Sequence, residues 1–401
     1  MISQAVTSFI YSNFIHMQIQ VAGRLTQTEE YYFSKKLREI AELNKSGDPV
    51  INLGIGSPDM PPHPSVIAAL SEYAAKPNVH GYQSYQGIPA LRQAIAHFYE
   101  RYYEVALNPD NEVLPLIGSK EGIMHICMTY LQEGDEALIP NPGYPTYASA
   151  VHLSGATGVP YTLTAENGWL PDLDALENQD LSKVKLMWVN YPHMPTGASA
   201  NPDFFERLVA FAKRNGILLC HDNPYSFILN DTPRSLLAVP GAKEVALELN
   251  SLSKSGNMAG WRVGMLLGDK DRLSEVIRFK SNMDSGSFLP LQMAAVKALE
   301  LGPDWYEDLN KVYRKRREKV YELLDLLQCA YDKSQVGLFI WASIPDTFSD
   351  GYALSDEVLK ARIFITPGGI FGSEGNKYVR VSLCTNEAVL DQAITRISHA
   401  K

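Results

Sequence analysis

Short apolar runs alternate with helical patterns through most of the chain, which predicts a mainly parallel sheet covered by helices on both faces. Five of these runs end in Gly, Pro, Ser, Asp, Tyr or Lys residues. The runs are 112–117, 136–139, 185–189, 217–220 and 245–249. Ligands of open α/β sheets gather beyond the carboxyl ends of the strands. The pattern therefore predicts a site assembled from several strand ends.

The last third of the chain has a different pattern. Residues 303–328 predict a long amphipathic helix, and short strands are expected near 337–342, 363–366 and 378–383. The expected fold class is α/β, with a large domain built on the parallel sheet and a smaller α+β domain. The predicted parts are a loose leader at 1–16, an N-terminal segment at 17–60 that packs with the small domain, a large domain at 61–285 and the small domain at 286–401.

Composition narrows the class of protein. A net charge of −9 argues against a nucleic-acid or membrane partner, because both need a basic surface. The four cysteines are scattered without a CxxC pair, so we expect buried free thiols in a reducing, cytoplasmic location, and we assign no metal ligands. Residues 1–16 lack the basic start and the cleavage site of a signal peptide.

Lys254 is the first candidate for chemistry. A lysine that forms a Schiff base must be neutral part of the time, which requires burial or neighbouring cations. The hydroxyls of Ser251 and Ser253 and the guanidinium of Arg262 could bind one phosphate while Lys254 reaches an aldehyde beside it. Taken alone, a lysine between two serines is usually an exposed loop residue.

Asp222 ends an apolar strand, and Tyr225 follows three residues later. A carboxylate there could partner a protonated pyridine nitrogen, which makes a cofactor ring an electron sink. The tyrosine could donate a hydrogen bond to a phenolic oxygen on the same ring. The alternatives are a helix N-cap or structural hydrogen bond for Asp222, and an aromatic side chain packed at a strand end for Tyr225.

Two further features fit an anionic ligand. The turn at 118–122 joins a strand to a helix, so its backbone N–H groups and the helix N-terminus could face a phosphate. Arg380 lies within an apolar strand pattern and needs an anionic partner. A substrate carboxylate bound by two hydrogen bonds would supply it, and a structural ion pair is the alternative.

Taken together and in their order along the chain, these motifs make the chain similar to the class I/II (fold type I) pyridoxal 5′-phosphate (PLP)-dependent aminotransferases of the aspartate aminotransferase superfamily. The resemblance extends from about Asn52 to Leu383. It is carried by residues 52–56, Tyr82 with Gly87, 118–122, 141–145, Asn190 with 195–197, 222–225, 251–254, 260–262 and Arg380.

The resemblance implies a ping-pong transfer of an amino group from an L-amino acid to a 2-oxo acid through internal and external aldimines of PLP. Lys254 then holds PLP and moves the proton between Cα and C4′. Asp222 keeps the pyridine nitrogen protonated, Tyr225 bonds O3′ of the ring, and Tyr144 stacks on the ring face.

The resemblance also implies how the ends of cofactor and substrate are held. Arg380 binds the α-carboxylate with help from the Gly56 backbone and Asn190. Tyr82 reaches the phosphate of the neighbouring subunit, which implies a homodimer with shared sites. The other implied phosphate ligands are Ser119, Lys120, Ser251, Ser253 and Arg262.

One position departs from the family pattern. The asparagine that donates to O3′ in the family is Met194 here, which cannot donate. We expect Tyr225 to keep its bond, with a water, Asn190 or His193 filling the gap. The family also leads us to expect cis peptide bonds before Pro142 and Pro195.

Substrate choice is less constrained. Residues 281–290 lack the arginine that dicarboxylate-specific relatives use, which favours a neutral or apolar donor such as alanine, methionine, an aromatic or a branched-chain amino acid. Residues 280–286 are similar to the branch with LL-diaminopimelate aminotransferases, so that donor stays open. The alternative activity is a β-lyase or related carbon–sulfur lyase of the same fold. A PLP-binding regulator would need a helix-turn-helix ahead of the fold, which the sequence lacks.

Overall fold

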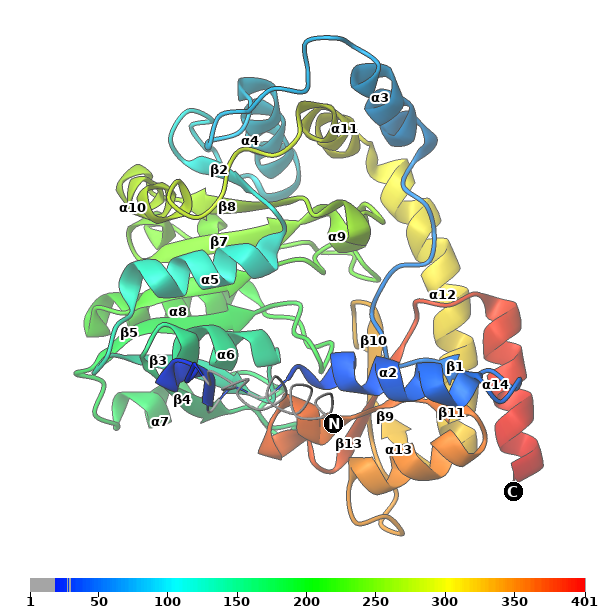
Figure 1. Ribbon diagram of the computed structural model, residues 1–401. Helices are drawn as coiled ribbons and strands as arrows, with labels where there is room; N and C mark the ends of the chain where they lie inside the picture. The colour runs from blue at the N-terminus through cyan, green and yellow to red at the C-terminus, as the bar shows by residue number, and fades with distance from the viewer. Residues whose placement is uncertain (1–18, 27, 29, 401) are drawn as a thin grey trace, which may run out of the picture.

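A seven-stranded sheet forms the centre of the large domain in the computed structural model, which describes residues 19–400 except 27 and 29 (Figure 1). The strand order is β2-β8-β7-β6-β5-β3-β4, and all neighbours are parallel except those of β8. The strands are β2 (Val113–Leu116), β3 (Glu136–Asn141), β4 (Thr157–Thr162), β5 (Val184–Asn190), β6 (Leu218–Asp222), β7 (Ala246–Ser251) and β8 (Gly264–Gly268). The predicted mainly parallel sheet is confirmed, and the leader predicted at 1–16 lies outside the described residues.

Strand β5 shows why both faces of this sheet are covered. Every residue of β5 except Lys185 is buried. Leu186 and Trp188 pack with α5, α6 and α10 on one face, whereas Met187 and Val189 pack with α4, α8 and α11 on the other. The α-helices between residues 64 and 299 are α3 (Pro64–Ala74), α4 (Pro89–Tyr103), α5 (Ser119–Tyr130), α6 (Pro145–Leu153), α7 (Leu173–Glu177), α8 (Pro202–Asn215), α9 (Leu252–Ser255), α10 (Lys270–Lys280) and α11 (Leu289–Leu299).

The small domain is built on an antiparallel sheet with the order β12-β13-β10-β9. Its strands are β9 (Ala330–Tyr331), β10 (Phe339–Ser343), β12 (Thr366–Pro367) and β13 (Tyr378–Ser382). The long helix α12 (Pro303–Leu326) runs down from the end of α11 to lie beside α14 (Glu387–Ala400), and α13 (Gly351–Lys360) packs below (Figure 1). No helix in the described part of the chain combines the length and apolarity needed to cross a bilayer.

The N-terminal segment joins both domains. After the short helix α1 (Gly23–Thr26), α2 (Tyr32–Asn44) lies across the small domain, and β1 (Ile51–Asn52) pairs in parallel with β11 (Ile363–Phe364) (Figure 1). The chain then crosses towards the large domain, and Asp59 forms a two-point ion pair with Arg316 of α12 at 2.6 and 3.0 Å. Arg316 is buried and also donates to the carbonyl oxygen of Leu383 at 3.1 Å. This guanidinium therefore fastens the crossing segment to α12 and to the end of β13.

Two smaller predictions can also be compared with the structure. The peptide bonds before Pro142 and Pro195 are cis as predicted, and the bond before Pro192 is cis as well. The four cysteines are unpaired. Three are buried as predicted, whereas Cys384 is partly exposed.

Replacing Asp59 by Asn should lower the free energy of unfolding by about 1–3 kcal/mol, because Arg316 stays buried with a weaker partner. Urea denaturation followed by fluorescence measures this change. Glu42→Gln, in the exposed pair with Lys45, is the control and should change little. Equal effects of the two substitutions would show that the Asp59–Arg316 pair contributes no more than a surface pair.

Candidate active site

A cavity of about 610 Å³ lies at the carboxyl ends of β5, β6 and β7, and the small domain and the start of α2 contribute its other walls. All predicted site residues except Tyr82 line it. They are Gly56, Ser119, Lys120, Tyr144, Asn190, Asp222, Tyr225, Ser251, Ser253, Lys254, Arg262 and Arg380. The parallel strands thus bring together residues that are up to 324 positions apart in the chain, counted from Gly56 to Arg380 (380 − 56).

One end of the cavity is built to hold an anion. Helix α5 begins at Ser119 directly after Gly118, whose φ of +82° suits glycine. A Cβ atom on Gly118 would lie 2.2 Å from Nη2 of Arg262, so the guanidinium rests against the turn. The helix N-terminus and this guanidinium together suit a phosphate group.

Ser251 at the end of β7 and Ser253 of α9 also line the cavity. Ser251 caps α9, since its Oγ accepts from the backbone N–H of Ser253 at 3.0 Å, and its hydroxyl donates to the Ser253 hydroxyl at 2.8 Å. Arg262 itself has a φ of +58°, a left-handed conformation for a non-glycine residue. Such backbone strain persists only where the surrounding structure enforces it, and it clusters at functional sites.

Asp222 lies deeper in the cavity at the end of β6. Its Oδ2 accepts a hydrogen bond from the Tyr147 hydroxyl at 2.9 Å, whereas no described residue bonds its buried Oδ1. Burial raises the pKa of Asp222 to about 6, although the Tyr147 hydrogen bond and the positive charges of His221 and Lys254 oppose the rise. A buried carboxylate oxygen without a protein partner fits a protonated pyridine nitrogen.

Lys254 reaches into the cavity from α9. Its Nζ donates to the carbonyl oxygen of Gly56. Burial lowers the pKa of the Lys254 ammonium, and the positive charges of Arg380 and Arg262 lower it further. A lysine with a lowered pKa is more often neutral, which both imine formation and proton transfer require.

Arg380 of β13 forms the third buried charge. Its guanidinium donates to the carbonyl oxygen of Gly54 at 2.7 Å, and it lies 3.8 Å from the ring centre of Phe339 and 4.7 Å from that of Phe371. No carboxylate of the described residues pairs with it, although the residue is only 4% exposed and its Nε has no hydrogen-bond partner among them. An anion from a ligand would supply the missing partner.

The contacts around Met194 bear on which group replaces the hydrogen-bond donor that the family has at this position. Arg380 Nη1 lies 3.2 Å from the sulfur of Met194. The Asn190 amide donates to the backbone oxygen of Asp222, and its oxygen accepts from the Met194 backbone. His193 bonds Thr196 and does not line the cavity, so replacement of the missing donor by Asn190 or His193 stays a prediction.

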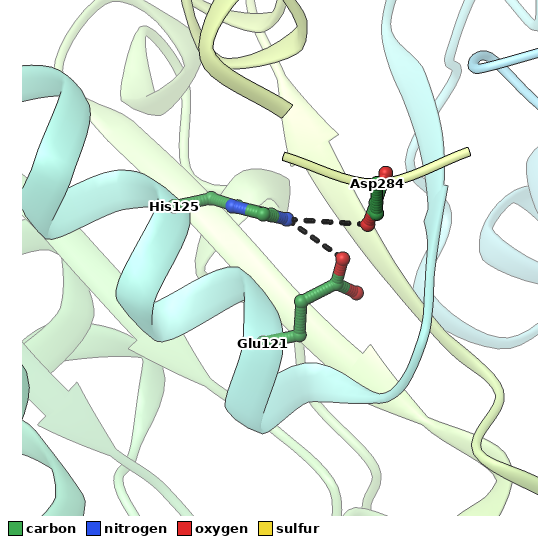
Figure 2. A group of neighbouring side chains, drawn as sticks. All are labelled: Glu121, His125 and Asp284. Carbon is green, nitrogen blue, oxygen red and sulfur yellow. Dashed lines mark hydrogen bonds and ion pairs between the residues drawn. The ribbon is translucent and has the colours of Figure 1, made fainter. Parts of the chain in front are cut away.

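A cluster of titratable groups lies beside the anion-binding end (Figure 2). His125 Nε2 is 2.7 Å from Glu121 and 3.7 Å from Asp284, and the possible ligand atoms lie within 4.8 Å of one another. The buried ammonium of Lys280 already bonds Asp284 and supplies a positive charge. Burial and a hydrogen bond with Glu121 raise the pKa of Asp284. We therefore assign the cluster to fastening residues 281–284 onto α5.

Sequence reasoning missed part of the cavity wall. Tyr147 follows Tyr144 by three positions at the start of α6, and this spacing could have indicated that both face the same side. The aromatic side chains of Phe33, Phe339 and Phe371 come from segments far apart in the sequence. No local pattern distinguishes them from core residues.

Comparisons with known proteins agree with this geometry. A family model described as aminotransferase class I and II matches residues 48–397. An LL-diaminopimelate aminotransferase from Dehalococcoides mccartyi is 40% identical over 385 residues, which cover 96% of this chain and 99% of that protein.

Solved structures show the same architecture. The substrate-bound structure of BacF from Bacillus subtilis has a TM-score of 0.90 at 38% identity, and the match covers 95% of this chain and 98% of that chain. An aminotransferase from Staphylococcus aureus has a TM-score of 0.86 at 30% identity, covering 94% and 98%.

Replacing Gly118 by Ala should weaken PLP binding by about tenfold or more, because the added methyl group displaces the Arg262 guanidinium and strains a left-handed backbone. Titration of the apoprotein with PLP measures the dissociation constant. Gly260→Ala is the control, since its Cβ would meet open space. A dissociation constant for Gly118→Ala equal to that of the control would contradict the anion-binding role of this turn.

Proposed function

From the membership of this chain in the class I and II aminotransferases, which makes it a PLP-dependent enzyme that transfers amino groups, we propose that its amino donor is an L-amino acid with an apolar or aromatic side chain. The predicted family, fold type I and cofactor are confirmed, and the lyase alternative is not favoured. The main support for the proposal is the buried guanidinium of Arg380. It lies against the aromatic rings of Phe339 and Phe371 and lines the same cavity as Lys254.

The proposal assigns a role to each charged group. PLP supplies an aldehyde that reacts with amines and a ring that accepts the electron pair released at the substrate α carbon. Lys254 Nζ removes the proton from that carbon and returns a proton during transfer. Asp222 holds a proton on the ring nitrogen, and Tyr225 donates to the ring oxygen.

Positioning of cofactor and substrate follows from the two ends of the cavity. Tyr144 covers the ring face, and Arg380 binds the α-carboxylate with the Gly56 backbone and Asn190. The phosphate is bound by the backbone N–H groups of the α5 turn and by side chains at the same end. These phosphate ligands are Ser119, Lys120, Ser251, Ser253 and Arg262.

The remaining wall supports an apolar donor. Phe33, Leu37 and Ile55 line the cavity near the aromatic rings around Arg380. Within the part of the chain that the structure describes, Asp222 is the one acidic side chain that lines the cavity, and the cofactor ring would engage it. A second ammonium group on the substrate would therefore be buried without a carboxylate from the described residues, which is costly.

LL-diaminopimelate is the second candidate, favoured by the name of the relative with 40% identity. It carries a distal ammonium and a distal carboxylate. Residues contributed by another subunit could accept these groups, so the two donors must be compared directly.

With 2-oxoglutarate as acceptor, kcat/KM for phenylalanine, leucine or methionine should exceed that for LL-diaminopimelate by about tenfold or more, since an unpaired buried ammonium costs at least about 1.4 kcal/mol. Amino-donor panels followed by oxo-acid formation measure this ratio. Lys254→Ala is the control, and it should lose activity with every donor. A higher kcat/KM for LL-diaminopimelate would replace the first candidate by the second.

We also infer a homodimer with shared sites. Tyr82 is 96% exposed and does not line its own cavity. Gln83 pairs with Gly286, and the exposed side chains Tyr85, Met283 and Phe288 lie in these same two segments. Large apolar side chains gathered on one surface support coverage by a second copy, with Tyr82 reaching the partner's phosphate.

Tyr82→Phe should leave the dimer intact but weaken PLP binding by several-fold, about the loss of one hydrogen bond to a charged group. Sedimentation velocity reports the assembly, and PLP titration reports the affinity. Tyr352→Phe, a partly exposed tyrosine of the small domain, is the matched control. A monomer at all concentrations, or unchanged PLP affinity, would contradict the shared site.

The cysteines support the expected cytoplasmic location. All four are unpaired thiols in the structure, and an oxidising compartment would favour disulfides. The proposal therefore places the reaction in a reducing compartment of the cell.

A further inference from the structure

A completely buried ion pair lies beneath the cofactor site and has no part in the proposed chemistry. His221 on β6 and Glu248 on β7 are register partners, and both side chains are 0% exposed. Nδ1 of His221 lies 2.9 Å from Oε2 of Glu248. His221 directly precedes Asp222 in the strand.

The contacts determine the charges of the pair. Nε2 of His221 faces the carbonyl oxygen of Tyr191 at 3.0 Å, which can only accept a hydrogen bond. The Glu248 carboxylate accepts from the hydroxyls of Tyr99 and Ser235, both at 2.8 Å. It also accepts from the backbone N–H of Leu236 at 2.9 Å. A carboxyl group with so many donors is ionised, so Nδ1 of His221 must donate as well. His221 is therefore an imidazolium.

The same network reaches both ends of the cofactor site. On the ring side, the Asn223 amide donates to Glu248 at 3.3 Å. On the phosphate side, the Asn250 amide donates to Tyr99 at 3.1 Å, while its oxygen accepts from the Ser251 backbone at 2.7 Å. The hydrogen bonds thus connect the carboxyl ends of β6 and β7 below the cavity.

We propose that His221 and Glu248 form a positioning pair for the cofactor: their network fixes Asp222 and Ser251, and the imidazolium favours the ionised form of Asp222. This inference rests on the proposed role of Asp222 towards the ring nitrogen. It adds two residues that touch neither cofactor nor substrate and that act through the strand ends.

Electrostatics around Asp222 agree with the geometry. The imidazolium of His221 opposes the effect of burial on the pKa of Asp222 more strongly than the Glu248 carboxylate reinforces it. Burial alone would raise the pKa of Glu248, but the charge and hydrogen bond of His221, together with the hydrogen bonds from Tyr99 and Ser235, outweigh burial and hold the pKa of Glu248 below its usual value.

The other groups that face Asp222 or the ion pair are one lysine and several tyrosines. Lys254 from α9 carries a charge that varies with its lowered pKa. The tyrosines have raised pKa values because they are buried, so they stay neutral: Tyr99 and Tyr103 from α4, Tyr144 and Tyr147 near α6, Tyr191 and Tyr225. His221 and Glu248 are therefore the fixed charges behind Asp222.

The test measures PLP affinity of the apoprotein from about pH 5 to about pH 9. Wild-type affinity should fall on the acid side as Asp222 gains a proton, near its pKa of about 6. In His221→Gln the midpoint of this fall should move upward by about one pH unit, because a positive charge close to the carboxylate is lost.

A second variant separates charge from packing. The double substitution His221→Gln with Glu248→Gln leaves a neutral pair and no unpaired buried carboxylate, so it should melt higher than His221→Gln. Its midpoint should lie between those of the wild type and of His221→Gln, because the Glu248 carboxylate raises the pKa of Asp222 less than the His221 charge lowers it. His125→Gln, which removes another fully buried imidazole with a glutamate partner, is the control and should keep the wild-type midpoint.

Nitrogen-15 NMR of the wild-type apoprotein gives an independent readout, in which His221 should show two protonated ring nitrogens. A neutral His221, or a wild-type midpoint in both His221 variants, would overturn the inference while leaving the proposed function in place. Failure of the wild-type protein to bind PLP would overturn the proposed function and this inference with it.

Discussion

Three charged groups of the cavity, whose charges the described residues do not fully compensate, determine how the site works. Asp222 has a carboxylate oxygen without a described partner, Arg380 has no carboxylate partner among the same described residues, and burial lowers the pKa of Lys254. Each state costs free energy, since ions and polar groups lose solvation on burial. A ligand with a cationic ring nitrogen, an aldehyde and a carboxylate would relieve all three. Ligand binding should therefore stabilise the folded protein by mass action, because the unfolded chain cannot assemble these groups.

The parallel sheet is what makes such an arrangement possible. Neighbouring strands β5 and β6 place Asn190 and Asp222 side by side in register, and β7 ends at Ser251 on the same edge. The surrounding core is tightly packed, as in the stacking of Tyr147 on Trp188 at 5.0 Å between ring centres. A rigid sheet can thus hold a strained residue such as Arg262 in place.

The sequence reveals the strand ends because each combines an apolar run with turn-forming residues, and it reveals Lys254, Asp222 and Arg380 because polar groups interrupt these runs. It does not reveal Phe33 or Phe371, since aromatic residues in the cavity wall and in the core have the same local pattern. The His221–Glu248 pair is equally hidden. His221 and Glu248 lie on different strands, and only their register on β6 and β7 brings them into contact. Local sequence patterns therefore predict the site residues at the strand ends, whereas the aromatic wall of the cavity and the buried His221–Glu248 pair depend on tertiary packing.

The aromatic surround of Arg380 explains how a cation can stay buried yet available. Ring faces attract a guanidinium without neutralising it, and the Met194 sulfur is only a weak acceptor. A protein carboxylate at this place would bind Arg380 by two strong hydrogen bonds and would compete with the substrate. Such soft partners reduce the cost of burial, while Nε of Arg380 stays without a partner among the described residues and Nη1 faces only the Met194 sulfur. The same rings form the apolar wall beside the guanidinium, so carboxylate binding and preference for an apolar side chain have one structural origin.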